Sequence, residues 1–130
     1  MRILIADDED VIRRGVIRVL QSLTDLEEFA EATNGKEAVQ KALEWKPDLI
    51  LLDVRLPGLS GFAVAAEIKQ HAPDIRILFF SIYDGKDIRE QVRAAGDGFI
   101  VKDKIVEMLP NALEALRRGE SFFPSDIQPD

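Results

Sequence analysis

The sequence predicts an α/β fold in which one parallel β-sheet is covered by helices on both faces. Short apolar runs alternate with segments whose apolar residues recur at helical spacing, and this alternation repeats five times. Each helix between two strands is then a right-handed crossover, which places helices on both faces of the sheet. Four of the apolar runs also stop at a polar residue, and this pattern points to function.

The five predicted strands are short and mostly apolar. Residues 2–6, 49–52, 75–80 and 99–101 are compact runs rich in Ile, Leu and Phe, typical of strands buried on both faces. Residues 28–32 are half-polar, as expected of an edge strand. We therefore expect a (βα)5 flavodoxin-like three-layer sandwich, with a five-stranded parallel sheet in the order 2-1-3-4-5.

Five helices are predicted after these strands. Asn34 is a suitable N-cap for the second helix and Pro47 ends it, while Asp10 is expected to cap the first. Arg13 and Arg14 are expected on a solvated helix face. The predicted helices cover residues 10–20, 35–45, 62–68, 88–95 and 105–118.

Composition narrows the chemistry. The chain has no cysteine and one histidine, which excludes disulfides, thiol nucleophiles and multi-histidine zinc sites, so any metal must be held by oxygen. The formal net charge of -7 disfavours nonspecific binding of nucleic acid or of an anionic membrane by this segment. No apolar stretch approaches the ~20 residues of a membrane span, and no charged leader precedes the first strand. We therefore expect a cytoplasmic protein.

Polar residues follow four of the predicted strands. Asp7 and Asp8 follow the first strand, Asp53 the third, Ser81 the fourth and Lys102 the fifth. Because the carboxyl ends of parallel strands lie along one edge of a sheet, these groups should converge in one crevice.

Such a crevice suits a divalent cation and a phosphoryl group. Three close carboxylates stay ionised only if a cation joins them, and Mg²⁺ prefers hard oxygen ligands. A carboxylate can act as the nucleophile of phosphoryl transfer if positive charge, here from Mg²⁺ and Lys102, neutralises the transferring group. Ser81 could donate a hydrogen bond to a phosphoryl oxygen and so sense the group.

Together these residues resemble the receiver (CheY-like) domains of two-component response regulators over nearly the whole chain. The matching features are Asp7-Asp8, Leu51-Leu52-Asp53-Val54-Arg55-Leu56-Pro57-Gly58 with Gly61, Ser81, and Phe99 three residues before Lys102. The resemblance implies that Asp53 accepts a phosphoryl group from a phosphohistidine on a sensor histidine kinase. It also implies a signalling domain that is no enzyme beyond its own Mg²⁺-dependent phosphorylation and dephosphorylation.

The resemblance also implies a role for each matching residue. Asp7, Asp8, Asp53 and the backbone carbonyl of Arg55 would hold Mg²⁺. Ser81 and Lys102 would bind the phosphoryl group. Ser81 and Phe99 would form a switch pair that changes the surface of the fourth helix, fifth strand and fifth helix.

The C-terminal part of the sequence is most like receivers of LuxR/NarL/FixJ-type transcriptional regulators. This likeness covers residues 99–103 and 118–124. It implies a receiver domain over residues 1–119, and over 120–130 the start of a linker to a DNA-binding effector domain absent from this chain. DNA would be contacted through that domain and not by this segment. The sequence leaves undecided whether phosphorylation produces a homodimer.

Two positions depart from the commonest receiver pattern. Ile82, beside Ser81, is bulkier than the usual residue, and we expect it to narrow the approach to the phosphoryl site. Asp103 stands where many receivers have proline. These are the only hints of an alternative, an interaction module that works without phosphorylation. Arg55 and Tyr83 flank the pocket, and we expect them to restrict attacking water.

A flavodoxin-type cofactor protein would share the fold. Its flavin phosphate, however, needs a neutral loop rich in hydroxyls or glycine after the first strand. This chain has Asp7-Asp8 there, and like charges argue against that alternative.

Overall fold

The computed structural model describes residues 1–23, 26 and 28–124, and the structural statements below concern these residues. The strands are β1 (Arg2–Ala6), β2 (Glu28–Ala32), β3 (Leu49–Asp53), β4 (Arg76–Ser81) and β5 (Gly98–Val101). The helices are α1 (Asp10–Gln21), α2 (Gly35–Trp45), α3 (Gly61–His71), α4 (Lys86–Ala95), the 3₁₀ helix η1 (Lys102–Lys104) and α5 (Ile105–Arg117). None of these helices is long and apolar enough to cross a membrane.

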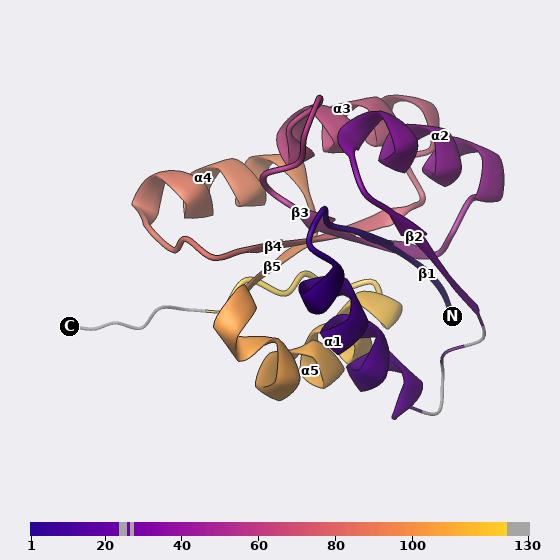
Figure 1. Ribbon diagram of the computed structural model, residues 1–130. Helices are drawn as coiled ribbons and strands as arrows, with labels where there is room; N and C mark the ends of the chain where they lie inside the picture. Colours follow the sequence, from indigo (N-terminus) through magenta and orange to yellow (C-terminus); the bar gives the residue numbers. More distant parts are fainter. Residues whose placement is uncertain (24–25, 27, 125–130) are drawn as a thin grey trace.

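The strands form one parallel sheet in the order β2-β1-β3-β4-β5 (Figure 1). Helices α1 and α5 cover one face, and α2, α3 and α4 cover the other (Figure 1). The predicted flavodoxin-like sandwich and its strand order are therefore confirmed. The half-polar strand β2 lies at an edge, as its sequence predicts.

Each face of the sheet has its own apolar cluster, because successive side chains of a strand point to opposite faces. Leu4 and Ile50 pack with the helices α2, α3 and α4, whereas Ile5 and Leu51 pack with α1 and α5. The two clusters support the helices unequally. Val92 is the one buried residue of α4, but α5 buries six of its residues.

The helix ends test two expectations about capping. The Oδ1 atom of Asn34 accepts a hydrogen bond from the N–H of Glu37, which confirms this N-cap. The expectation for Asp10 is wrong. Asp10 is the first residue inside α1, and the N-cap position belongs to Glu9, whose side chain makes no capping bond.

The segment after α5 joins the free edge of β5. The N–H of Phe122 donates to the carbonyl of Asp97, and the carbonyl of Phe122 accepts from the N–H of Phe99, both at 2.9 Å. The Phe123 ring packs against the apolar cluster, 5.0 Å from the guanidinium carbon of Arg93. The first part of the predicted linker, residues 120–124, thus lies against the sheet, and residues 125–130 lie outside the described residues.

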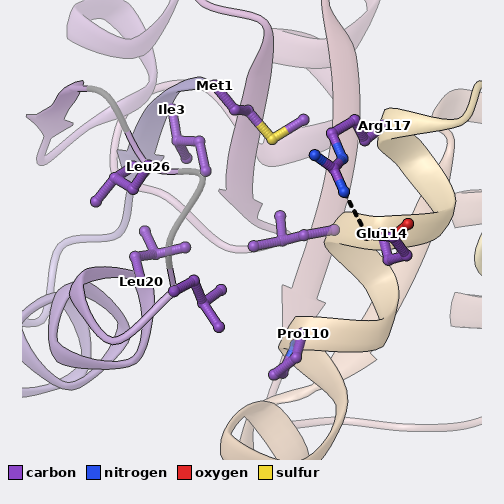
Figure 2. Close-up of a pocket in the computed structure, with 9 residues that line it drawn as sticks. Met1, Ile3, Leu20, Leu26, Pro110, Glu114 and Arg117 are labelled. Atoms are coloured by element: carbon purple, nitrogen blue, oxygen red, sulfur yellow. Dashed lines mark hydrogen bonds and ion pairs between the residues drawn. The ribbon is translucent and has the colours of Figure 1, made fainter.

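An apolar pocket of about 220 Å³ opens between α5 and the C-terminal end of α1 (Figure 2). Its lining includes Ile3 and Leu20, with the Glu114–Arg117 ion pair beside them at 2.6 Å. Ile3 lies near the start of β1, so this pocket is at the amino-terminal end of the sheet. It is separate from the polar residues that follow the strands.

Candidate functional site

The three acids predicted to converge do so at the carboxyl ends of β1 and β3. Ala6 is paired with Leu52 in the sheet, so the next residues, Asp7 and Asp53, come out side by side. One carboxylate oxygen from each of Asp7, Asp8 and Asp53 lies within 4.8 Å of the others. Asp7 and Asp53 are buried, while Asp8 is exposed at the edge of the cluster.

Backbone groups orient the two buried carboxylates. Asp7 Oδ1 accepts a hydrogen bond from the N–H of Glu9 at 2.8 Å, and Asp53 Oδ1 accepts one from the N–H of Arg55 at 3.1 Å. Asp7 Oδ2 is buried and accepts no well-aligned hydrogen bond. Each acid therefore has one oxygen held by the loop that follows its strand, and the other oxygen faces the cluster.

Lys102 reaches this cluster from the residue after β5. Its ammonium nitrogen lies 2.9 Å from Asp7 Oδ2, 3.1 Å from Asp53 Oδ2 and 3.3 Å from Glu9 Oε1. Burial lowers the pKa of Lys102, but the carboxylates of Asp7 and Asp53 outweigh burial and raise that pKa above its ordinary value. Lys102 therefore remains a cation throughout the neutral range.

The surroundings of Lys102 favour its charged form, whereas the surroundings of Asp53 disfavour its charged form. Burial raises the pKa of Asp53 to about 6, although the Arg55 N–H and the Lys102 ammonium act to lower it, and the nearby charge of Asp7 adds to the rise. The site therefore disfavours the ionised carboxylate of Asp53. Strongly shifted pKa values of this kind are typical of functional sites.

Ser81 and Phe99 lie on the neighbouring strands β4 and β5. Ser81 is buried, and its Oγ accepts a hydrogen bond from the N–H of Tyr83 at 3.0 Å. Phe99 is buried in the apolar cluster with α4 and is paired in the sheet with Phe79. Ser81 thus lies at the carboxyl end of β4, and Phe99 lies on the adjacent strand β5 in the cluster that includes α4.

The flank of the site is formed by loop residues. The guanidinium carbon of Arg55 lies 4.4 Å from the centre of the Tyr83 ring, which is a cation–π contact. Ile82 is exposed and is not part of the core. Arg55 and Tyr83 therefore form a unit beside Asp53.

Two residues of the site were missed from the sequence. The sequence does not predict that Glu9 contacts Lys102. The expectation that Arg13 lies on a solvated helix face is wrong, because Arg13 is buried. Arg13 is buried because its guanidinium is paired with Asp10 and Glu31 and donates to the carbonyl of Asp7. The i, i+3 spacing of Asp10 and Arg13 is a weak signal of their pairing. Glu31 lies on β2, and no sequence spacing links it to Arg13.

The residues present fit a hard divalent cation. Three carboxylate oxygens lie close together, and Asp7 Oδ2 is buried with the Lys102 ammonium 2.9 Å away but no well-aligned hydrogen bond. Mg²⁺ is commonly held by one or two carboxylates with water and phosphate oxygens completing its shell. Asp7, Asp8 and Asp53 are the residues that would hold it.

The fold and the rim together define an α/β signalling domain of the response-regulator type. The family model of the response regulator receiver domain matches residues 3–114, and the chain belongs to this family. Receiver domains are signalling domains rather than enzymes that turn over a separate substrate.

The chain is similar to curated bacterial regulators. The transcriptional regulatory protein YxjL of Bacillus subtilis is 34% identical over 124 residues, which is 95% of this chain and 57% of YxjL. The response regulator protein VraR of Staphylococcus aureus is 32% identical over 128 residues, covering 98% of this chain and 61% of VraR. The chain therefore spans about three-fifths of the length of these curated relatives.

A solved structure gives the same relationship. A LuxR-family two-component response regulator from Aurantimonas sp. SI85-9A1 is 29% identical and superposes with a TM-score of 0.90. The match covers 97% of this chain and 91% of that one. Fold and sequence thus agree on the receiver family, and this solved neighbour is a LuxR-family regulator.

Proposed function

We propose that this chain is the phosphoacceptor receiver of a two-component response regulator. The observation that carries the proposal is the buried Asp53 carboxylate, set 3.1 Å from the Lys102 ammonium and beside Asp7 and Asp8. A carboxylate oxygen of Asp53 would bond to the phosphorus of a phosphohistidine on a sensor histidine kinase. The phosphorus–nitrogen bond would break, and the imidazole nitrogen would leave with the electron pair.

The residues around Asp53 have distinct parts in this reaction. Lys102 lowers the pKa of Asp53 and so favours the ionised form that attacks. Bound Mg²⁺, held by Asp7, Asp8, Asp53 and the Arg55 carbonyl, would offset charge on the phosphoryl oxygens. Ser81 and Lys102 would then bind the transferred group.

The output of the reaction would be a change of the α4–β5–α5 surface. Ser81 would move toward the phosphoryl group and Phe99 would follow into the space it leaves. Of the helices beside β5, α4 buries one residue and α5 buries six, so α4 is the one held by less apolar contact. A partner that prefers the changed surface shifts the population by its differential affinity.

The wider assignments follow from the relatives' kind and length. YxjL and VraR are longer regulators, so we infer that a C-terminal domain binds DNA and that residues 120–130 begin the linker to it. Because the chain is a response regulator receiver, we also infer that the protein is cytoplasmic and that its partner is a sensor histidine kinase. Phosphorylation-dependent pairing of two receivers would be measured by light scattering with and without phosphodonor.

Intact-mass spectrometry after incubation with Mg²⁺ and acetyl phosphate tests the proposal. The chain should gain one phosphoryl group, and Asp53→Asn should gain none. Asp74→Asn, which changes an exposed acid at the opposite end of the sheet, is the matched control and should be labelled like the original chain. Absence of labelling in the original chain would instead favour the interaction module that works without phosphorylation.

We also propose that the Arg55–Tyr83 unit slows hydrolysis of the phosphorylated form. The contact between the two side chains places bulk and charge beside Asp53, where they would hinder an attacking water. An Arg55→Ala, Tyr83→Ala double variant should lose its label faster, and an unchanged rate of loss would refute this role.

A further inference from the structure

Arg13 is a buried cation behind the acidic rim, and the chemistry proposed above does not use it. Its Nη1 donates to the backbone carbonyl of Asp7 at 2.8 Å, and its Nε donates to Glu31 at 2.8 Å. Its Nη2 pairs with Asp10. The guanidinium therefore joins the loop after β1, the strand β2 and the first turn of α1.

Such a set of contacts uses the shape of arginine and not only its charge. The planar guanidinium offers several donors in fixed directions, whereas a lysine ammonium is a compact point charge. Glu31 raises the pKa of Arg13, as does Asp10, and together they outweigh the effect of burial. The cation is thus permanently charged and compensated within the fold.

The contact with the Asp7 carbonyl matters because this carbonyl belongs to the peptide bond between Asp7 and Asp8. Asp7 is held at three points: its N–H donates to the Ala32 carbonyl at 3.1 Å, its carbonyl accepts from Arg13, and its Oδ1 accepts from Glu9. Its Oδ2 is then directed into the cluster, 2.9 Å from the Lys102 ammonium. The plane of the same peptide sets the direction in which Asp8 leaves β1.

We propose that Arg13 is a positioning residue for the metal site, which holds the Asp7–Asp8 peptide so that both carboxylates face Asp53. This inference rests on the proposed function, because it concerns the Mg²⁺ which that function requires. Groups that orient metal ligands from outside the coordination shell typically change metal affinity by about 10- to 100-fold when they are lost. We expect about a tenfold effect here.

The sign of the effect separates positioning from simple electrostatics. Removing a positive charge near three carboxylates should by Coulomb's law strengthen the binding of a dication. Loss of the carbonyl contact should instead weaken it, because the carboxylates are no longer held together. A variant without the guanidinium therefore gives opposite results under the two explanations.

The experiment is an NMR titration of the metal-free chain with magnesium chloride at constant ionic strength. Arg13→Met should bind Mg²⁺ about tenfold more weakly than the original chain. Arg14→Met, which removes the exposed neighbouring charge, should stay within about twofold. Equal or tighter binding by folded Arg13→Met overturns the proposal, even if its melting temperature falls, because a purely structural role lowers stability without changing the dissociation constant.

Arg13→Lys covers the case in which Arg13→Met does not fold. It keeps the charge and loses the fork, so we expect Mg²⁺ binding several-fold weaker than in the original chain, and unchanged binding overturns the proposal. Failure of the proposed function would look different. The original chain itself would then show no Mg²⁺-dependent shifts around Asp53 and no labelling by acetyl phosphate.

Discussion

The middle of the sheet and its carboxyl-terminal rim are both buried, but they are built from opposite kinds of residue. In the middle, Leu4, Ile50 and Phe79 have no exposed surface and pack in one apolar cluster. The buried polar and charged residues of the described chain are Asp7, Arg13, Asp53 and Ser81, and all of them lie at the rim. Burial in the middle therefore adds to stability, whereas at the rim burial disfavours the ionised form of Asp53.

The largest expected change in the free energy of unfolding comes from a substitution in the middle of the sheet. Ile50→Ala removes a fully buried side chain from the central strand β3, where neighbours on both sides limit relaxation. The free energy of unfolding should fall by about 4 kcal/mol. Urea denaturation measures it, and a loss below about 1 kcal/mol would contradict the close packing described for this strand.

A substitution at the rim should have the opposite sign. Asp53→Asn removes the buried carboxylate whose pKa is raised to about 6. Without metal at neutral pH, the free energy of unfolding should rise by on the order of 2 kcal/mol. Urea denaturation in a chelating buffer is the measurement, and a destabilised Asp53→Asn would show that the ionised carboxylate is favoured by its surroundings.

The pH dependence of this difference has a definite direction. Between pH 3.8 and about 6 the native chain keeps a proton on Asp53 that the unfolded chain has released. The contribution of Asp53 to stability is therefore full below pH 3.8 and is lost as the pH rises through about 6. Stability curves of the original chain and Asp53→Asn should coincide in acid and separate toward neutral pH.

Binding of Mg²⁺ should offset part of the destabilisation caused by the buried, ionised Asp53. At ten times its dissociation constant, Mg²⁺ should raise the free energy of unfolding of the original chain by about 1.4 kcal/mol. Asp53→Asn should gain less, because it has lost one of three carboxylates. Thermal unfolding with and without Mg²⁺ tests this, and equal gains in both chains would place the ion away from Asp53.

The smallest expected effect concerns the outer part of the rim. Glu9 is exposed and lies 3.3 Å from the Lys102 ammonium, which also contacts Asp7 and Asp53. Glu9→Gln should change stability by less than about 0.5 kcal/mol, since exposed ion pairs contribute little. A larger loss in urea denaturation would mean that Glu9 belongs with the buried part of the rim.

Much of the fold and part of the site could be predicted because their signals are local. The alternation of strand and helix patterns, the half-polar strand 28–32 and the Asn34 cap depend on neighbours in the sequence. Polar residues after buried strands also identified Asp7, Asp8, Asp53 and Lys102, because parallel strands all end at the same edge. Helix spacing, by contrast, could not predict the burial of Arg13.

The sequence by itself determined the order of elements, the strand order of the sheet and the edge at which acids and lysine would meet. Only the tertiary structure decided that Glu9 reaches Lys102, that Phe122 pairs with the edge of β5 and that Arg13 is enclosed by Asp10, Glu31 and the Asp7 carbonyl. The physical reason is that hydrophobic periodicity specifies which residues leave water. The pairing of buried charges depends on how separate elements pack together in space.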